Sequence, residues 1–400
     1  MLLDRFIKYV KIETRSDENS NTTPSSKNQF DLLRTLEDEL KALGVECELT
    51  DTGRLYAFVP GNTKYEAVGL CAHVDTAPDF TGENVKPNVI KKYDGSDVKL
   101  GKSDRVLSIK EYPKLKRAIG KTLVTTDGTT LLGADDKAGV AIIMEVVEAL
   151  LKLNLYERRP MYILFTPDEE IGRGAEIFDT NKFKATFAYT FDGSEPEVIN
   201  IETFNAKSAQ INITGKAIHP GDAKGVMINA ALVANDFISM LPAKMVPSKT
   251  EGHEGFNHLC EISGCVDSAH IHYILRNHDD VKLKKQEKQF LDIADKLIRK
   301  YPGVKIDLKI SDSYKNMLGV IVDKPACKNH IENVFRDLAI EFKYEPIRGG
   351  TDGTTFSYLG CPTPNLGTGS YNHHGPFEYA ILEEMEQLVK IGVQIYKISE

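Results

Sequence analysis

The sequence predicts an α/β protein in which a mostly parallel sheet, flanked by helices, carries a second, inserted ferredoxin-like domain. Three observations support this fold class. Short apolar runs repeatedly stop at acidic residues, helical stretches separate these runs, and from about Ala206 the pattern changes to strands of alternating polarity. A length of 400 residues indicates about two domains. We expect residues 1–205 and 312–400 to form the first domain and residues 206–311 the insertion.

The first domain is expected to open with a polar loop at 15–27 and a helix at 28–43, in which Leu residues recur at helical spacing up to Gly44. The Lys-rich segment 79–125 is expected to be a long connection with a short hairpin. Residues 140–153 are apolar nearly all round, which indicates a buried helix. Three further segments are short, apolar and bounded by breakers, and are expected to be buried strands: 67–72, 161–165 and 186–191.

The insertion is expected to follow the order βαββαβ, which is the ferredoxin-like unit. Its elements are predicted as a strand at 206–214, a helix at 226–241, strands at 260–266 and 270–275, a helix at 283–301 and a strand at 304–310. After it the α/β pattern resumes, with a helix at 326–341, a Gly-rich stretch at 348–355, a loop at 361–376 and a last helix at 380–397.

Composition excludes several classes of protein. The net charge of −8, with no basic stripe to offset it, argues against a general binder of nucleic acid or anionic membranes. The opening stretch MLLDRFIKYVKIET is too charged for a secretory signal, and no apolar run is long enough to span a membrane. The six cysteines are scattered without a CxxC pair, so we expect reduced, buried thiols in a cytoplasmic protein.

Residues with chemical potential follow the apolar segments. They are His73, Asp75, Asp135 or Asp136, Glu169, Glu170 and Asp192. Open α/β sheets place their sites at the carboxyl ends of the strands, so these side chains are expected to converge. Several carboxylates at one edge would repel one another, and a bound cation would remove the conflict. Mixed His and carboxylate ligands suit zinc, or cobalt or manganese, and the pair His373-His374 is expected to supply one further ligand.

Two zinc ions would balance the local charge. Their +4 against −3 from Asp135, Glu170 and Asp192 leaves +1, and counting Asp75 and Glu169 brings the site to −1. Two metals roughly 3.5–4 Å apart would activate one water and polarise a carbonyl. The chemistry also needs a base that is not a ligand, and the adjacent Glu169 and Glu170 can divide these tasks. Asp75 would orient His73 through its other ring nitrogen.

Five motifs in order carry a resemblance to a known family: His73-Val-Asp75, Gly133-Ala-Asp-Asp-Lys-Ala-Gly139, Thr166-Pro-Asp-Glu-Glu-Ile-Gly172, Asp192-Gly193 and His374-Gly375. They resemble the di-zinc M20 metallopeptidases, and within these the tripeptide aminopeptidases. The resemblance covers nearly the whole chain. It implies a zinc-peptidase-like catalytic domain with an inserted lid and dimerisation domain.

Carried over position by position, the resemblance implies a first metal held by His73, Asp135 and Asp192 and a second held by Asp135, Glu170 and His374. Asp135 is selected over Asp136 because related members place the bridging acid two residues before the lysine. His374 is selected over His373 because it directly precedes Gly. Glu169 matches the family's general base, and Asp75 its carboxylate behind the metal ligand.

The resemblance also implies two substrate-binding residues. Arg348, in the motif Arg348-Gly-Gly-Thr-Asp-Gly353, would clamp the terminal carboxylate of the peptide. His219, in the motif Ala217–Gly225, would stabilise the developing oxyanion. In related enzymes such a His comes from the partner subunit, so a homodimer through the insertion is expected.

The function expected from these observations is a cytoplasmic di-zinc aminopeptidase that removes the N-terminal residue from tripeptides. A metal-bound hydroxide would attack the first peptide carbonyl while Glu169 acts as general base. One alternative is another activity of the same scaffold: a dipeptidase, a carboxypeptidase or an N-acyl amino acid amidohydrolase. An alternative of another class is a non-catalytic peptide-binding dimer, for which ligands or the base should be missing. None is missing.

Overall fold

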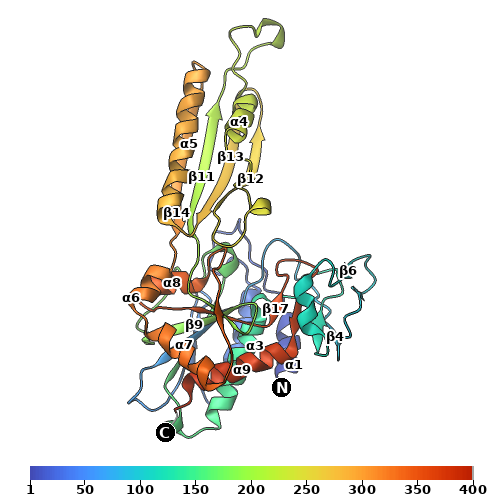
Figure 1. Cartoon of the computed structure of the whole chain (residues 1–400), viewed down its shortest axis with the longest axis vertical. Helices are drawn as coiled ribbons and strands as arrows, with labels where there is room; N and C mark the ends of the chain where they lie inside the picture. Colours follow the sequence, from blue (N-terminus) through green and yellow to red (C-terminus); the bar gives the residue numbers. More distant parts are fainter. Residues whose placement is uncertain (399–400) are drawn as a thin grey trace. The chain divides into compact units, whose positions relative to one another are not determined.

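The computed structural model describes residues 1–398 of the chain (Figure 1). The chain divides into two compact units. Unit 1 comprises residues 1–201, 317–345 and the chain from 351 on, and unit 2 comprises residues 202–316 and 346–350. The insertion expected at 206–311 lies inside unit 2. Residues 202–205, 312–316 and 346–350, which were expected in the first domain, belong to unit 2 instead.

Unit 1 is built around an eight-stranded mixed sheet. In spatial order its strands are β1 (Glu46–Leu49), β2 (Leu55–Val59), β8 (Met161–Thr166), β3 (Val68–His73), β9 (Phe187–Gly193), β16 (Asn365–Gly367), β10 (Val198–Asn200) and β15 (Lys343–Tyr344). The central strands β8, β3, β9 and β16 run parallel, whereas β1 with β2, β2 with β8, and β10 with β16 pair antiparallel. All six residues of β3 are buried, as expected for a strand covered on both faces.

Helices pack against this sheet. The apolar helix α3 (Ala134–Leu151) contacts β3 and β9, and both α1 (Leu2–Val10) and α9 (Leu382–Tyr396) pack on α3. Helix α2 (Gln29–Ala42) lies against β1 and β2, and α7 (Ala326–Asp337) against β9 and α9. Two shorter helices, α6 (Leu318–Asp323) and α8 (Asp352–Tyr358), contact each other. Helix α1, which the sequence analysis missed, buries Leu2, Phe6, Tyr9 and Val10 along one amphipathic stripe.

The long connection after β3 contains more structure than one hairpin. Strands β5 (Val98–Lys99) and β6 (Val106–Leu107) form the expected short hairpin, and a 3₁₀ helix, η1, follows at Pro113–Ala118. A separate antiparallel sheet joins β17 (Ser370–Tyr371), β18 (Tyr379–Ile381), β7 (Leu123–Thr125) and β4 (Asn88–Ile90). The segment predicted as a loop at 361–376 therefore contains β16 and β17, and the loop 372–378 joins β17 to β18.

Unit 2 has the expected element order βαββαβ: β11 (Asn205–Thr214), α4 (Ala230–Ser239), β12 (Phe256–Gly264), β13 (Ser268–Asn277), α5 (Asp280–Lys300) and β14 (Lys305–Tyr314). Its antiparallel sheet has the order β12-β13-β11-β14. The helix predicted at 226–241 begins only at Ala230, because Asn229 accepts hydrogen bonds from Ala231 N and Leu232 N and so caps the helix.

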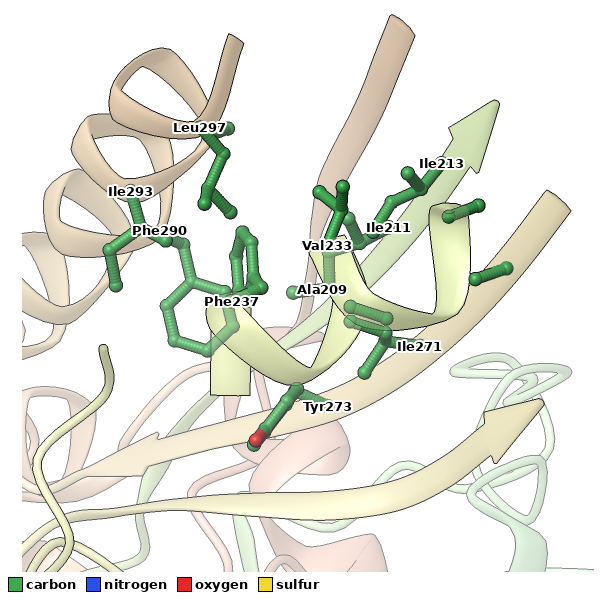
Figure 2. Packing of buried hydrophobic residues seen from close by; sticks show 14 of the residues in the cluster. Ala209, Ile211, Ile213, Val233, Phe237, Ile271, Tyr273, Phe290, Ile293 and Leu297 are labelled. Carbon is green, nitrogen blue, oxygen red and sulfur yellow. The ribbon is translucent and has the colours of Figure 1, made fainter. Parts of the chain in front are cut away.

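The core of unit 2 lies between its sheet and its two long helices (Figure 2). Phe237 of α4 meets Phe290 of α5 with ring centroids 5.6 Å apart, and Ile211 of β11 and Ile271 of β13 complete the layer from the sheet side. The alternating burial along β13 places its other side chains on the opposite, more exposed face of the sheet.

The cysteines fulfil the expectation only in part. All six are free, and Cys71, Cys327 and Cys361 are buried. Cys260 and Cys265 are exposed, so the prediction of buried thiols was wrong for them; Cys260 lies on β12, the edge strand whose residues beyond Leu259 are all exposed. Within residues 1–398, no helix combines the length and apolar character needed to cross a bilayer.

Candidate metal centre

The residues singled out at the strand ends lie in unit 1, next to the parallel strands β8, β3 and β9. His73 is the last residue of β3, and Asp192 is the next to last of β9. Glu169 and Glu170 lie on a 3₁₀ turn, η3 (Glu169–Ile171), just after β8. Because the three strands are parallel neighbours, their carboxyl ends meet at one edge.

Five of these side chains form two clusters with metal-ligand spacing. His73, Asp135 and Asp192 make the first, and Asp135, Glu170 and His374 make the second; in each, the potential ligand atoms all lie within 4.8 Å of one another. Asp135 belongs to both. Its Oδ1 lies 3.1 Å from Nε2 of His73, and its Oδ2 lies 3.5 Å from Nε2 of His374. One carboxylate therefore faces both imidazoles.

Asp136 and His373 are the sequence neighbours of Asp135 and His374, and their contacts are different. The carboxylate of Asp136 is fully buried and accepts hydrogen bonds from the backbone N–H groups of His73 and Gly139. His373 places Nε2 2.9 Å from the Ser370 hydroxyl and Nδ1 3.3 Å from Oδ2 of Asp135. Asp136 and His373 are in neither cluster of the described chain.

Glu169 and Asp75 lie beside the clusters without joining them. Oε2 of Glu169 is 4.0 Å from Nε2 of His73. The buried carboxylate of Asp75 accepts hydrogen bonds from the backbone N–H groups of Glu169 and Glu170, at 3.0 and 3.2 Å. Oδ1 of Asp75 also lies 3.3 Å from Nδ1 of His73. Asp75 thus ties the imidazole at the end of β3 to the turn that carries both glutamates.

Negative charge is crowded at this edge of the sheet. Burial raises the pKa of Glu170 to about 7, and the neighbouring Asp135 adds to the shift. Burial also raises the pKa of Asp192, although a hydrogen bond with His73 opposes the effect. Oε1 of Glu170 is buried and has no hydrogen-bond partner among residues 1–398. Imidazole nitrogens, crowded carboxylates and an unsatisfied buried oxygen together suit divalent cations such as zinc.

Two residues that the sequence analysis did not assign support the clusters. Thr351 donates its hydroxyl to Oδ2 of Asp192 at 3.0 Å. Glu378 accepts the backbone N–H of Asp135 at 2.9 Å. Thr351 lies in the Gly-rich stretch 348–355, and Glu378 lies just after the predicted loop at 361–376. The sequence could not have identified either residue as a support of the clusters, because each acts through a hydrogen bond to a residue far away in the chain.

The two residues expected to bind substrate lie in unit 2. His219 is exposed at the start of a 3₁₀ turn, η4 (Pro220–Asp222), and its Nδ1 accepts the N–H of Gly221 at 3.1 Å. The guanidinium of Arg348 is held by a loop of the same unit. It donates to the carbonyls of Gly252 and Glu254 and to the Thr250 hydroxyl, at 2.7 to 2.8 Å.

Comparisons with known proteins agree with the motifs. The model of peptidase family M20/M25/M40 matches residues 126–397. Peptidase T of Staphylococcus aureus strain Newman is 45% identical over 396 residues, covering 98% of this chain and 97% of the relative. Peptidase T of strain JH9 of the same species matches with the same identity and coverage.

Solved structures share the fold. A tripeptidase from Staphylococcus aureus superimposes with a TM-score of 0.78 at 22% identity, and the aminopeptidase PepT from Bacillus cereus with a TM-score of 0.76 at 21% identity. A dinuclear metal-binding M20 peptidase from Bacillus subtilis superimposes with a TM-score of 0.66 at 13% identity. Each match covers 98% of this chain and 96% of the other. Together with the matching motifs and the 45% identity of its relatives, these findings show that the chain belongs to peptidase family M20/M25/M40 and is a hydrolase.

Proposed function

We propose that the chain is a di-zinc aminopeptidase that removes the N-terminal residue from tripeptides. One ion would be held by His73, Asp135 and Asp192, and the other by Asp135, Glu170 and His374. One observation carries this proposal: two clusters of potential metal ligands share Asp135, and Glu170 belongs to one of them. The carboxylate of its neighbour Glu169 lies 4.0 Å from the His73 ring but belongs to neither cluster, so it is available as a base. The names of the relatives, peptidase T and tripeptidase, support the substrate class.

When bound, the two ions would lower the pKa of a water molecule and polarise the peptide carbonyl; cobalt or manganese could substitute for zinc in such a donor set. Glu169 accepts the proton of the attacking water and then delivers it to the amine that leaves. Asp75 keeps Glu169 in place through the Glu169 backbone N–H and keeps His73 oriented through its ring.

Arg348 is proposed to bind the terminal carboxylate of the substrate and so to favour tripeptides over longer peptides. Arg348→Ala should reduce the ratio of kcat/KM between a tripeptide and the corresponding tetrapeptide. The guanidinium also holds the 250–254 loop, so Thr250→Val is the matched control: it removes one hydrogen bond to the loop and keeps the charge. Unchanged length discrimination in Arg348→Ala would exclude this role.

His219 is proposed to donate a hydrogen bond to the developing oxyanion. Because Nδ1 accepts the Gly221 N–H, a neutral ring carries its proton on Nε2 and can donate it. The residue is proposed to act across a homodimer formed through unit 2, whose edge strand β12 leaves Ile262 exposed. Mixing an inactive His219→Ala protein with an inactive Glu169→Gln protein should restore activity if the histidine works in trans, and should leave the mixture inactive otherwise.

We also propose a cytoplasmic location, which agrees with six free cysteines, two of them exposed.

The proposed function is tested by a hydrolysis panel combined with metal analysis. Matched di-, tri- and tetrapeptides, together with N-acylated amino acids, are incubated with enzyme of known zinc content. Tripeptides should be cleaved with the highest kcat/KM and should release the N-terminal residue, and activity should disappear on chelation and return with zinc. Preferred cleavage of a dipeptide or an N-acyl amino acid, or release of the C-terminal residue, would assign one of the other activities of this scaffold instead.

A further inference from the structure

The loop between β17 and β18 carries a buried carboxylate in addition to the exposed His374. Glu378 lies four residues further along this loop, and only 1% of it is exposed. Burying a carboxylate is costly unless hydrogen-bond donors surround it. The donors that surround Glu378 come from a segment more than 240 residues away in the chain.

Three backbone N–H groups point at this carboxylate. Oε2 accepts from Leu132 N at 2.7 Å and from Gly133 N at 2.8 Å, and Oε1 accepts from Asp135 N at 2.9 Å. Hydrogen bonds to a charged acceptor are roughly twice as strong as those between neutral groups. Glu378 therefore fixes the backbone of the segment that presents the carboxylate shared by both clusters.

The backbone around Asp135 needs an acceptor of this kind. Asp135 has φ −82° and ψ 105°, which is not helical, although it stands at the start of α3. The first N–H groups of a helix have no acceptor within the helix itself. The carboxylate of Glu378 therefore connects the loop that carries His374 to the backbone of the segment that carries Asp135.

We propose that Glu378 is a positioning residue that sets the affinity of the site for zinc by fixing Asp135 relative to the loop of His374. This inference rests on the ligand set proposed above. It predicts that both ions are affected, because Asp135 belongs to both clusters. A residue needed only for folding would lower stability and leave zinc affinity unchanged.

The test replaces Glu378 by glutamine, which keeps the size but turns one acceptor into an NH₂ group facing a backbone N–H. The matched control is Glu383→Gln. Glu383 also accepts a backbone N–H, that of Thr122 at 2.8 Å, together with the Thr122 hydroxyl at 3.0 Å, and it is in neither cluster. Zinc affinity is measured by competition with a chromogenic chelator, and the metal-free proteins are melted by circular dichroism.

Glu378→Gln should bind both zinc ions about 10- to 100-fold more weakly than the unmodified chain, the usual effect of removing a group behind a metal ligand. Glu383→Gln should keep the original zinc affinity. Glu378→Asp, which keeps the charge but is one methylene shorter, provides a second variant. Zinc affinity equal to that of the unmodified chain in either folded Glu378 variant would overturn the proposal. So would failure of both variants to fold while Glu383→Gln folds, since the role would then be structural.

A third variant separates this inference from the ligand assignment. Asp135→Asn should lose zinc in the same titration. If it binds zinc like the unmodified chain, the proposed ligand set is wrong. If Asp135→Asn loses zinc while the Glu378 variants keep it, the ligand set stands and only the role of Glu378 is refuted.

Discussion

Replacing Glu169 and, separately, its neighbour Glu170 by glutamine distinguishes a base from a ligand within one turn of chain. Both side chains leave η3, and Asp75 accepts both of their backbone N–H groups. Glutamine keeps the size of each side chain, so the two variants differ from the original only in charge and in proton or metal affinity. Any difference between them must come from where each carboxylate points.

The structure sets the expected magnitudes. The carboxylate of Glu169 is in neither cluster, so Glu169→Gln should retain two zinc ions per chain. Its kcat should fall by about 10²- to 10⁴-fold, or roughly 3 to 5.5 kcal/mol, which is the usual contribution of a general base. Oε2 of Glu170 lies 3.0 Å from Nε2 of His374. Glu170→Gln should therefore lose one ion as well as activity, because its cluster keeps only two of three ligands.

The assay combines zinc content after exhaustive dialysis, measured by mass spectrometry, with steady-state hydrolysis of a tripeptide. Metal content is decisive, because both variants are expected to be slow. If Glu169→Gln retains only one ion, Glu169 is a ligand and the assignment of the base is refuted. Two ions with kcat within threefold of the unmodified chain would show that the proton goes elsewhere.

Three further predictions concern stability. Phe237→Ala empties a buried position of the unit 2 core and should cost about 3 to 5 kcal/mol in urea unfolding, whereas Leu232→Ala, 61% exposed on the same helix, should change stability by less than about 0.5 kcal/mol. Gly139→Ala would place a Cβ 2.1 Å from the carbonyl oxygen of Phe191; it should cost at least about 1 to 3 kcal/mol, and an unchanged melting temperature would contradict this. Burial lowers the pKa of His330 from 6.5 to about 4, so its neutral form is favoured in the fold and stability is lost as pH falls through this range. Between pH 7 and 5 the chelator-treated chain should lose about 2 kcal/mol more than His330→Phe, and parallel pH profiles would refute the assignment.

The amino-acid sequence by itself determined the fold class and the chemical character of the site. Apolar runs ending in acids identified β3, β8 and β9, because a strand buried on both faces has few other compositions available to it. The order of strands and helices in unit 2 was also predicted correctly, because hydrophobic residues recur every two residues in a half-buried strand and about every 3.6 residues in an amphipathic helix. Short elements such as β10, β16 and α8 were missed, because three to seven residues carry too little periodic signal.

Only the tertiary structure decided what each member of a doubled residue does. Asp135 and Asp136 have identical side chains, so the local sequence does not show which carboxylate faces the histidines. In the structure, the carboxylate of Asp136 instead accepts hydrogen bonds from the backbone N–H groups of His73 and Gly139. The resemblance to a family had chosen Asp135, but no local property of the sequence could. Glu378 and Thr351 were beyond prediction for the same physical reason. A hydrogen bond between segments far apart in the chain forms only if the tertiary fold brings the two segments together. The local sequence around either residue does not contain this information.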